Sequence, residues 1–118
     1  MARRFVPDAG DIVWLEFSPQ AKRTRAGHEQ AGHRPALVVS PATYNGKTGT
    51  MLCCPMTTQI KGYPFEVVIH AEGISGAVLS DQVKNLDWRA RNAELICTLP
   101  DEIINEVLEK LGTLLITT

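Results

Sequence analysis

A nine-residue polar stretch, Gly27–Pro35, contains most of the side chains in this chain that are suited to chemistry. It offers two imidazoles, a carboxylate, an amide and a guanidinium, from His28, His33, Glu29, Gln30 and Arg34. Glu29 could accept a proton, and either histidine could transfer one near neutral pH. Arg34 could bind a phosphate through two parallel hydrogen bonds. The stretch therefore has the groups needed for proton transfer beside a phosphate.

Thr57 extends this set, because it ends an apolar run and its hydroxyl could hydrogen-bond a phosphate oxygen. RNA contains its own nucleophile, the 2′-hydroxyl. Internal cleavage of RNA then requires a base, an acid and a cation for the phosphorane, and no metal. The residues fit that reaction, but their spacing alone leaves open that they are solvent-exposed or structural loop residues.

Other chemistries lack their motifs. The sequence has no phosphate-binding glycine loop, no dinucleotide-binding glycine pattern and no serine in a nucleophile elbow. His28 and His33 would need further ligands nearby to bind a metal. Cys53 and Cys54 are adjacent, so on a strand they would point to opposite faces. We expect no metal and no cofactor, and reduced, buried cysteines in a cytoplasmic protein.

Length and composition indicate one domain over residues 1–118, with 44% apolar and 21% charged residues. No apolar run is long enough to span a membrane, and Arg3-Arg4 precedes no hydrophobic signal segment. The net charge is −1, but the charge is unevenly distributed. Four basic residues and one acid give Lys22–Arg34 a local +3, and four acids and one lysine give Asp101–Lys110 a local −3. These patches could bind a polyanion, or they could be two unrelated solvated faces.

The loop with the polar stretch lies between two expected strands. Alternation and apolar runs predict strands over 11–17, 34–40, 51–57, 65–70, 76–83 and 93–98. We expect a short helical turn or hairpin connection over 41–50 and an irregular segment over 85–92. The continuous apolar centre of the second strand predicts burial on both faces. The pattern indicates a mainly β (α+β) fold, a small antiparallel β-barrel with a C-terminal helix.

The helix is expected to begin at Pro100, with Asp101 and Glu102 favourable at its N-terminus. Its apolar residues recur at helical spacing, which predicts core or dimer packing. Glu106 and Lys110 are placed to form an i,i+4 ion pair on its polar side.

Four separated blocks of the sequence resemble one known family. They are Glu29–Pro35, Pro55–Gln59, Lys61–Val67 and Asp81–Lys84. In this order and spacing they resemble the MazF toxins of bacterial toxin–antitoxin modules, within the MazF/PemK group. Shorter matching stretches, such as Phe5–Asp8 and Trp88–Arg91, extend the likeness over nearly the whole chain.

The resemblance implies an SH3-like small β-barrel that forms a homodimer. It implies a metal-independent, sequence-specific endoribonuclease that cuts single-stranded RNA, leaving a 2′,3′-cyclic phosphate and a 5′-hydroxyl. Cleavage at ACA-like sites is the expectation from the nearest relatives. The resemblance also implies a MazE-like antitoxin whose acidic C-terminal segment occupies the RNA groove.

Carried over position by position, the resemblance makes Glu29 the candidate base for the 2′-hydroxyl. It makes Arg34 the group that stabilises the phosphorane, and Thr57 a contact to the scissile phosphate. RNA-binding residues are expected beside them at His28, Gln30, His33, Gln82, Lys84 and Arg89. The segment Ala21–Arg25 is longer and more basic than the family pattern, so we expect Lys22, Arg23 and Arg25 to grip the RNA backbone.

A different class of function shares the same expected architecture. A non-catalytic toxin that binds gyrase, as CcdB does, would have a similar barrel and dimer, so fold alone does not exclude it. The joint presence of Glu29, Arg34 and Thr57 favours the ribonuclease, because a protein that only binds needs no base, phosphate clamp and hydroxyl together.

Overall fold

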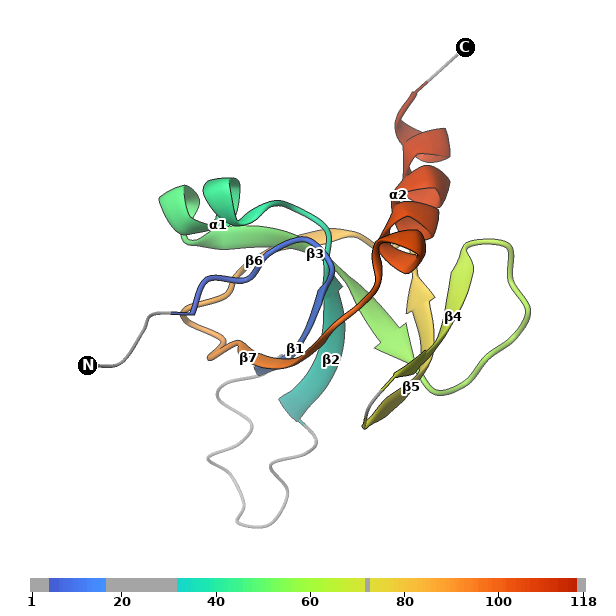
Figure 1. Cartoon of the computed structure of the whole chain (residues 1–118), viewed down its shortest axis with the longest axis horizontal. Helices are drawn as coiled ribbons and strands as arrows, with labels where there is room; N and C mark the ends of the chain where they lie inside the picture. The colour runs from blue at the N-terminus through green and yellow to red at the C-terminus, as the bar shows by residue number, and fades with distance from the viewer. Residues whose placement is uncertain (1–4, 17–31, 72, 117–118) are drawn as a thin grey trace.

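The computed structural model describes residues 5–16, 32–71 and 73–116. Figure 1 shows a strongly curled antiparallel sheet with one long helix packed beside it. The elements are β1 (Asp11–Glu16), β2 (His33–Val38), α1 (Ala42–Thr48), β3 (Thr50–Thr57), β4 (Glu66–Ala71), β5 (Ile74–Leu79), β6 (Lys84–Asp87), β7 (Glu94–Thr98) and α2 (Asp101–Leu115). The predicted fold class, a small antiparallel β-barrel with a C-terminal helix, is confirmed in the form of a curled half-barrel.

Strand β3 is the centre of the sheet. The strand order is β4-β5-β3-β2-β1-β7, and β6 also pairs with β3. The first part of β3 pairs with β2 and β6, whereas its last two residues, Met56 and Thr57, pair with β5. Its pairing with β2 stops at Ala36 opposite Pro55. Proline lacks the N–H that a continued ladder would use, so β3 leaves β2 at Pro55 and turns towards β5.

Two hydrophobic clusters pack on the two faces of β2 and β3. One contains Leu37, Val39 and Cys54 together with α2, and the other contains Ala36, Val38 and Cys53 together with Trp88. The predicted burial of the second strand on both faces is therefore confirmed. Cys53 and Cys54 lie in different clusters, as the alternation of a strand requires.

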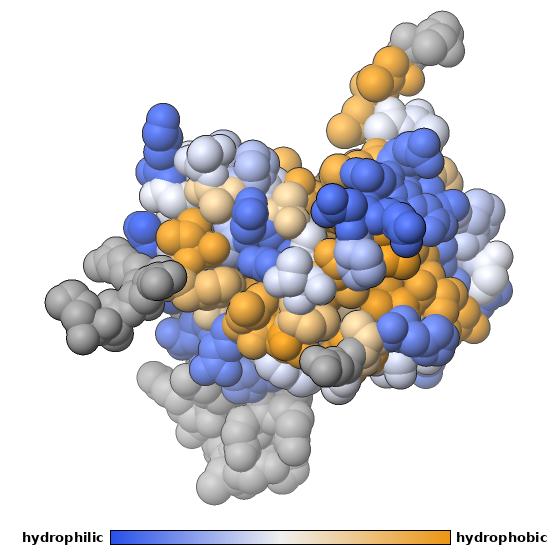
Figure 2. Space-filling model, in the orientation of Figure 1, coloured by the Kyte–Doolittle hydropathy of each residue, from blue (hydrophilic) through white to orange (hydrophobic). Residues whose placement is uncertain are grey.

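Helix α2 buries one face over the first of these clusters. Ile104, Val107 and Leu111 are its buried residues, and Asp101 and Glu102 occupy its first turn. The apolar stripe continues past the buried face, since Leu114, Leu115 and Ile116 are exposed. In Figure 2 the hydrophobic colour gathers at this C-terminal end of the helix. Within the described chain no helix is long and apolar enough to cross a membrane.

The predicted ion pair on α2 is wrong. No ion pair joins Glu106 and Lys110, although both lie in the described part of the chain. Lys110 Nζ instead donates a hydrogen bond of 2.9 Å to the backbone carbonyl of Pro64. This ties the helix to the turn before β4, a contact that helix periodicity cannot reveal.

The segment predicted to be irregular contains strand β6. It pairs with β3 from Thr50 opposite Asp87 to Cys53 opposite Lys84. Asn85 and Asp87 are poor strand formers, and the strand has a single apolar residue, so tertiary pairing outweighs local preference here. The fifth strand also lies earlier than expected, at Ile74–Leu79, and a turn at Ser80 and Asp81 follows it.

A fully buried asparagine fixes the turn that follows β6. The Asn45 side-chain amide donates to the carbonyl oxygens of Pro7, at 2.7 Å, and Ser40, at 3.0 Å. Its side-chain oxygen accepts from the Ser40 hydroxyl, and its backbone carbonyl accepts from the Trp88 indole N–H. Trp88 is thereby held in the second cluster, and the turn over residues 88–92 is held with it.

Candidate active site

Arg34 and Thr57 lie on either side of the place where β2 and β3 separate. Ala36 opposes Pro55, and Val38 opposes Cys53. Side chains two residues apart on a strand point to the same face, so Arg34 and Thr57 lie on one face, each just beyond the last paired residue. A groove of about 420 Å³ opens there, lined by Trp14, Arg34, Pro35, Met56, Thr57, Thr58, Gln59, Ile74 and Ser75.

The Thr57 hydroxyl is oriented by the chain that follows it. Its oxygen accepts a hydrogen bond of 3.1 Å from the backbone N–H of Gln59. A hydroxyl that accepts in this way can still donate its own hydrogen. The arrangement therefore suits donation to an anionic oxygen in the groove.

The backbone of Thr57 is held by the close approach of β5. Thr57 pairs with Ala77, and a Cβ placed on the adjacent Gly76 would lie 2.4 Å from the Thr57 carbonyl oxygen. No side chain fits at that distance, so glycine is required there. Gly76 thus allows β3 and β5 to meet where the candidate hydroxyl is presented.

A second groove, of about 220 Å³, continues from Thr57 and Gln59. Its further lining residues are Lys61, Tyr63, Glu66, Leu79 and Gln82. The Glu66 carboxylate accepts hydrogen bonds from three consecutive backbone N–H groups, those of Lys61, Gly62 and Tyr63. The Tyr63 hydroxyl donates to Asp81, and this hydrogen bond raises the pKa of Tyr63. Together these contacts hold the segment Lys61–Tyr63, which lines the same groove as Gln82.

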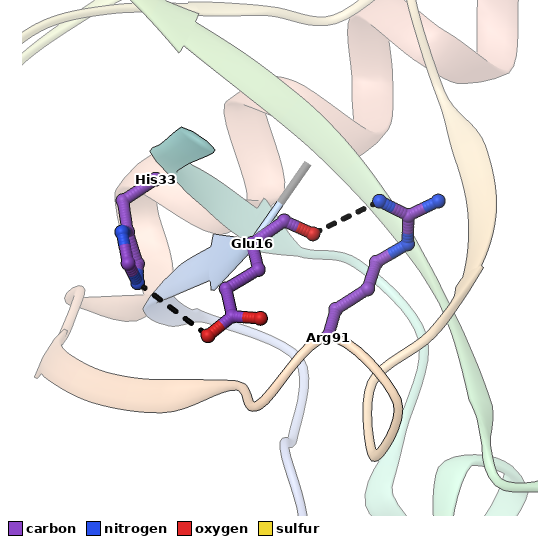
Figure 3. Close-up of polar contacts among 3 residues, drawn as sticks. All are labelled: Glu16, His33 and Arg91. Atoms are coloured by element: carbon purple, nitrogen blue, oxygen red, sulfur yellow. Dashed lines mark hydrogen bonds and ion pairs between the residues drawn. The ribbon is translucent and has the colours of Figure 1, made fainter. Parts of the chain in front are cut away.

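His33 lies beside Arg34 and contacts a buried carboxylate. His33 is the first residue of β2, and its Nε2 is 3.8 Å from Oε2 of Glu16, the residue opposite it on β1. Arg91 reaches the same residue from the other side, where its Nη1 donates to the Glu16 carbonyl at 3.0 Å. Figure 3 shows Glu16 between these two side chains.

The buried cysteines do not have the chemistry of nucleophiles. Cys53 and Cys54 are free and buried. Burial raises the pKa of Cys53 to about 11 and that of Cys54 to about 12. A thiol nucleophile needs a lowered pKa instead. In the described ranges no group of three or more His, Cys, Asp or Glu side chains is arranged to hold a metal ion.

The sequence and the fold match one family of toxins. Residues 8–115 match the family model described as PemK-like, MazF-like toxin of type II toxin-antitoxin system. This chain is a member of that MazF-like toxin family. It is 49% identical over 115 residues to the endoribonuclease toxin MazF of Escherichia coli strain K12, covering 98% of this chain and 99% of the relative.

Solved MazF structures share the fold closely. MazF from Deinococcus radiodurans is 55% identical with a TM-score of 0.80, over 95% of this chain and 98% of that one. A MazE-MazF crystal structure from the same organism aligns at 48% identity with a TM-score of 0.82, over 98% and 100% of the two chains. The predicted family is thus confirmed in both sequence and structure.

In this MazF-like chain the structure brings some predicted site residues together and separates others. Gln82 shares a groove with Thr57, and Lys84 lies opposite Cys53, on the same face of the sheet as Thr57. Arg89 stacks over the Trp88 ring at 4.7 Å and lies against Gly49. Gly49 precedes the first residue of β3, and Thr57 is its last, so Arg89 lies at the opposite end of the strand.

The remaining predicted site residues lie outside the described residues. They are Glu29, His28, Gln30, Lys22, Arg23 and Arg25. The described chain on either side ends at Glu16 and resumes at Gly32, next to His33 and Arg34. Three residues that make contacts beside Arg34 or Thr57 could not be recognised from the sequence: Glu16, Gly76 and Arg91. Each acts through a contact with a distant segment, which no local motif signals.

Proposed function

We propose that this chain is the toxin of a type II toxin–antitoxin module and acts as a metal-independent, sequence-specific endoribonuclease on single-stranded RNA. The observation that carries the proposal is the placement of Arg34 and Thr57 on one face, at the mouth of a shared groove. The 49% identity to an endoribonuclease toxin over nearly the whole chain supports the same activity.

In the proposed reaction the 2′-hydroxyl of the RNA attacks the adjacent phosphorus. Glu29 takes the proton of the hydroxyl, a P–O2′ bond forms and the P–O5′ bond breaks. The leaving 5′-oxygen takes up a proton, so the products are a 2′,3′-cyclic phosphate and a 5′-hydroxyl. Arg34 stabilises the extra negative charge of the phosphorane, and the Thr57 hydroxyl donates to a phosphate oxygen.

RNA binding in this proposal follows the two grooves that meet at Thr57. Gln82 and Lys84 lie towards one side of Thr57, and His33 lies beside Arg34 on the other. Further contacts are assigned to His28, Gln30, Lys22, Arg23 and Arg25. Arg89 stays a predicted contact, for an RNA strand that is long enough to reach the opposite end of β3. We expect ACA-like sequences among the cleavage sites.

The proposal includes two protein partners. A MazE-like antitoxin with an acidic C-terminal segment would place carboxylates against Arg34 and Lys84. These carboxylates would occupy the positions that RNA phosphates take in the proposal. MazE-MazF structures are among the solved structures that this chain resembles. A second copy of the chain would cover apolar side chains such as Leu114 and Leu115, which are 51% and 70% exposed. The free thiols fit a reducing, cytoplasmic location.

The decisive experiment is cleavage of a long, defined RNA in EDTA, with each cut mapped and its ends identified. Wild-type protein is compared with Arg34→Ala and Thr57→Val, and Thr48→Val on α1 serves as a matched hydroxyl control. We expect discrete cuts with cyclic phosphate ends, lost at least 100-fold in the two site variants and retained in the control.

Each other outcome has a definite meaning. Intact RNA with the wild-type protein contradicts the proposal and favours the non-catalytic alternative, which a gyrase-dependent DNA cleavage assay would reveal. Cleavage that persists in Arg34→Ala and Thr57→Val contradicts the assignment of the site.

A further inference from the structure

Glu16 is a carboxylate buried at the last residue of β1. The residue is 6% exposed, and its side chain is 8% exposed. Removing an ionised carboxylate from water is costly unless partners compensate for the lost hydration. The contacts of Glu16 therefore have to compensate for the hydration that its side chain loses on folding.

The residue is held from both sides. On the β2 side its Oε2 lies 3.8 Å from His33 Nε2. On the other side its backbone N–H donates to the Arg91 carbonyl at 3.0 Å, and its own carbonyl accepts from Arg91 Nη1 at 3.0 Å. Figure 3 shows the His33 and Arg91 side chains on opposite sides of Glu16.

These contacts continue the sheet beyond the point where its ladder ends. The pairing of β1 with β7 stops at Trp14 opposite Glu94. Two residues further on, Arg91 supplies the hydrogen bonds that a neighbouring strand would supply. Arg91 is itself fixed, because its turn is anchored by Trp88 and the buried Asn45.

The terminal rung of the β1–β2 ladder, the pair of Glu16 and His33, is next to the candidate catalytic arginine. Glu16 opposes His33, and Leu15 opposes Arg34. Terminal rungs of a sheet open more readily than central ones. An opening here would move Arg34, and a displacement of about 1 Å in a catalytic group can reduce the rate about 100-fold.

We propose that Glu16 is a positioning residue, which acts through His33 to hold the start of β2 and so fixes the Arg34 guanidinium against the phosphate. The proposal rests on the proposed ribonuclease function. In this proposal Glu16, which is buried, acts without contacting the RNA. Its effect belongs to the chemical step, because the geometry of Arg34 matters most when charge builds up on the phosphorane.

The first test is kinetic. Glu16→Gln keeps the size of the side chain and removes its charge, and Glu94→Gln on β7 is the exposed control. We expect Glu16→Gln to lower kcat about 100-fold, leave KM within about threefold and keep a thermal transition well above the assay temperature. Glu94→Gln should match the wild type.

A double-variant comparison separates positioning from general damage. Lysine cannot use the bidentate geometry of arginine, so Arg34→Lys already lacks what Glu16 provides. In that background Glu16→Gln should reduce kcat by less than about threefold. An equal reduction in both backgrounds, or wild-type kcat in Glu16→Gln, would overturn the proposal while leaving the ribonuclease function intact.

The second test does not depend on catalysis. Amide hydrogen exchange is measured along β2 in the wild type, Glu16→Gln and Glu94→Gln. We expect exchange at the start of β2 to be at least tenfold faster in Glu16→Gln alone. Unchanged exchange refutes the positioning role even if the wild-type protein cleaves no RNA, in which case the proposed function fails separately.

Discussion

Among single residues, the candidate site depends on the side chains of Arg34 and Thr57 and on the absence of a side chain at Gly76. Thr57 can present its hydroxyl because Gly76 lets β5 approach its carbonyl oxygen. Arg34 can face the same groove because Pro55 ends the pairing of β2 with β3. The candidate groups therefore depend on Gly76 and Pro55 for their placement.

Gly76→Ala should impair the reaction without touching the substrate. The added Cβ would meet the Thr57 carbonyl oxygen at 2.4 Å, so β3 or β5 must shift. We expect a decrease of about 1–3 kcal/mol in the free energy of unfolding and a fall in kcat of about 100-fold. Gly73→Ala is the control, because Gly73 also has a positive φ, at +72°, but nothing within 4 Å of an added Cβ. Equal kcat values in the two variants would contradict this account.

The sequence pointed to candidate reactive residues but not to the residues that support them. Arg34 and Thr57 could be named because family motifs surround them. Gly76 could be placed on a strand, but its requirement for glycine arises from an oxygen on another strand. Glu16 was one more residue in an alternating pattern, and that pattern gives no sign that the carboxylate is buried against His33.

Among the helices and strands, those with a strong local sequence pattern were predicted well. The strand that depends on pairing with a distant segment was not. The apolar run of β2 indicated its burial on both faces, because a continuous apolar run can be recognised in the strand's own sequence. Strand β6 was missed because its stability comes from pairing with β3. Helix α2 was predicted from its periodicity, whereas the partner of Lys110, the Pro64 carbonyl, depends on the tertiary fold.

Helix α2 should owe its stability to its buried face and not to its surface charges. Ile104→Ala should lower the free energy of unfolding by about 2–5 kcal/mol, because it leaves a cavity in the core. Glu106→Ala should change it by less than about 0.5 kcal/mol, since Glu106 forms no ion pair with Lys110. Urea denaturation of both variants measures the difference. A similar decrease in both would show that the surface of the helix contributes more than its packing suggests.

For the chain as a unit, a net charge of −1 conceals an uneven distribution of charge along the sequence. The acidic run belongs to α2, on the far side of the first hydrophobic cluster from β2 and Arg34. The expectation of one domain over residues 1–118 stays a prediction, alongside a family match that spans residues 8–115. Composition alone could indicate neither the groove nor the position of the acidic run on α2.

The basic segment Ala21–Arg25 should control how RNA binding responds to salt. Replacing Lys22, Arg23 and Arg25 by glutamine should weaken binding for all RNA sequences. It should also reduce the slope of log affinity against log salt by about 0.7 for each phosphate that the variant no longer neutralises. Lys47→Gln on α1 is the control, and titrations at several salt concentrations give the slopes. An unchanged slope in the triple variant would mean that these side chains do not bind the RNA backbone.

The order of the strands also affects how the protein folds during its synthesis. Strand β1 pairs with β7, and Leu99 donates its N–H to the carbonyl of Gly10, so the first strand needs a partner from near the other end of the chain. Arg91, which holds Glu16, is also translated late. A nascent chain can pair β4 with β5 early, but the contacts of Glu16 beside Arg34 are completed only after Arg91 has left the ribosome. The edge of the sheet that carries Arg34 therefore has to wait for β7 and Arg91 to be synthesised before it can take its final form.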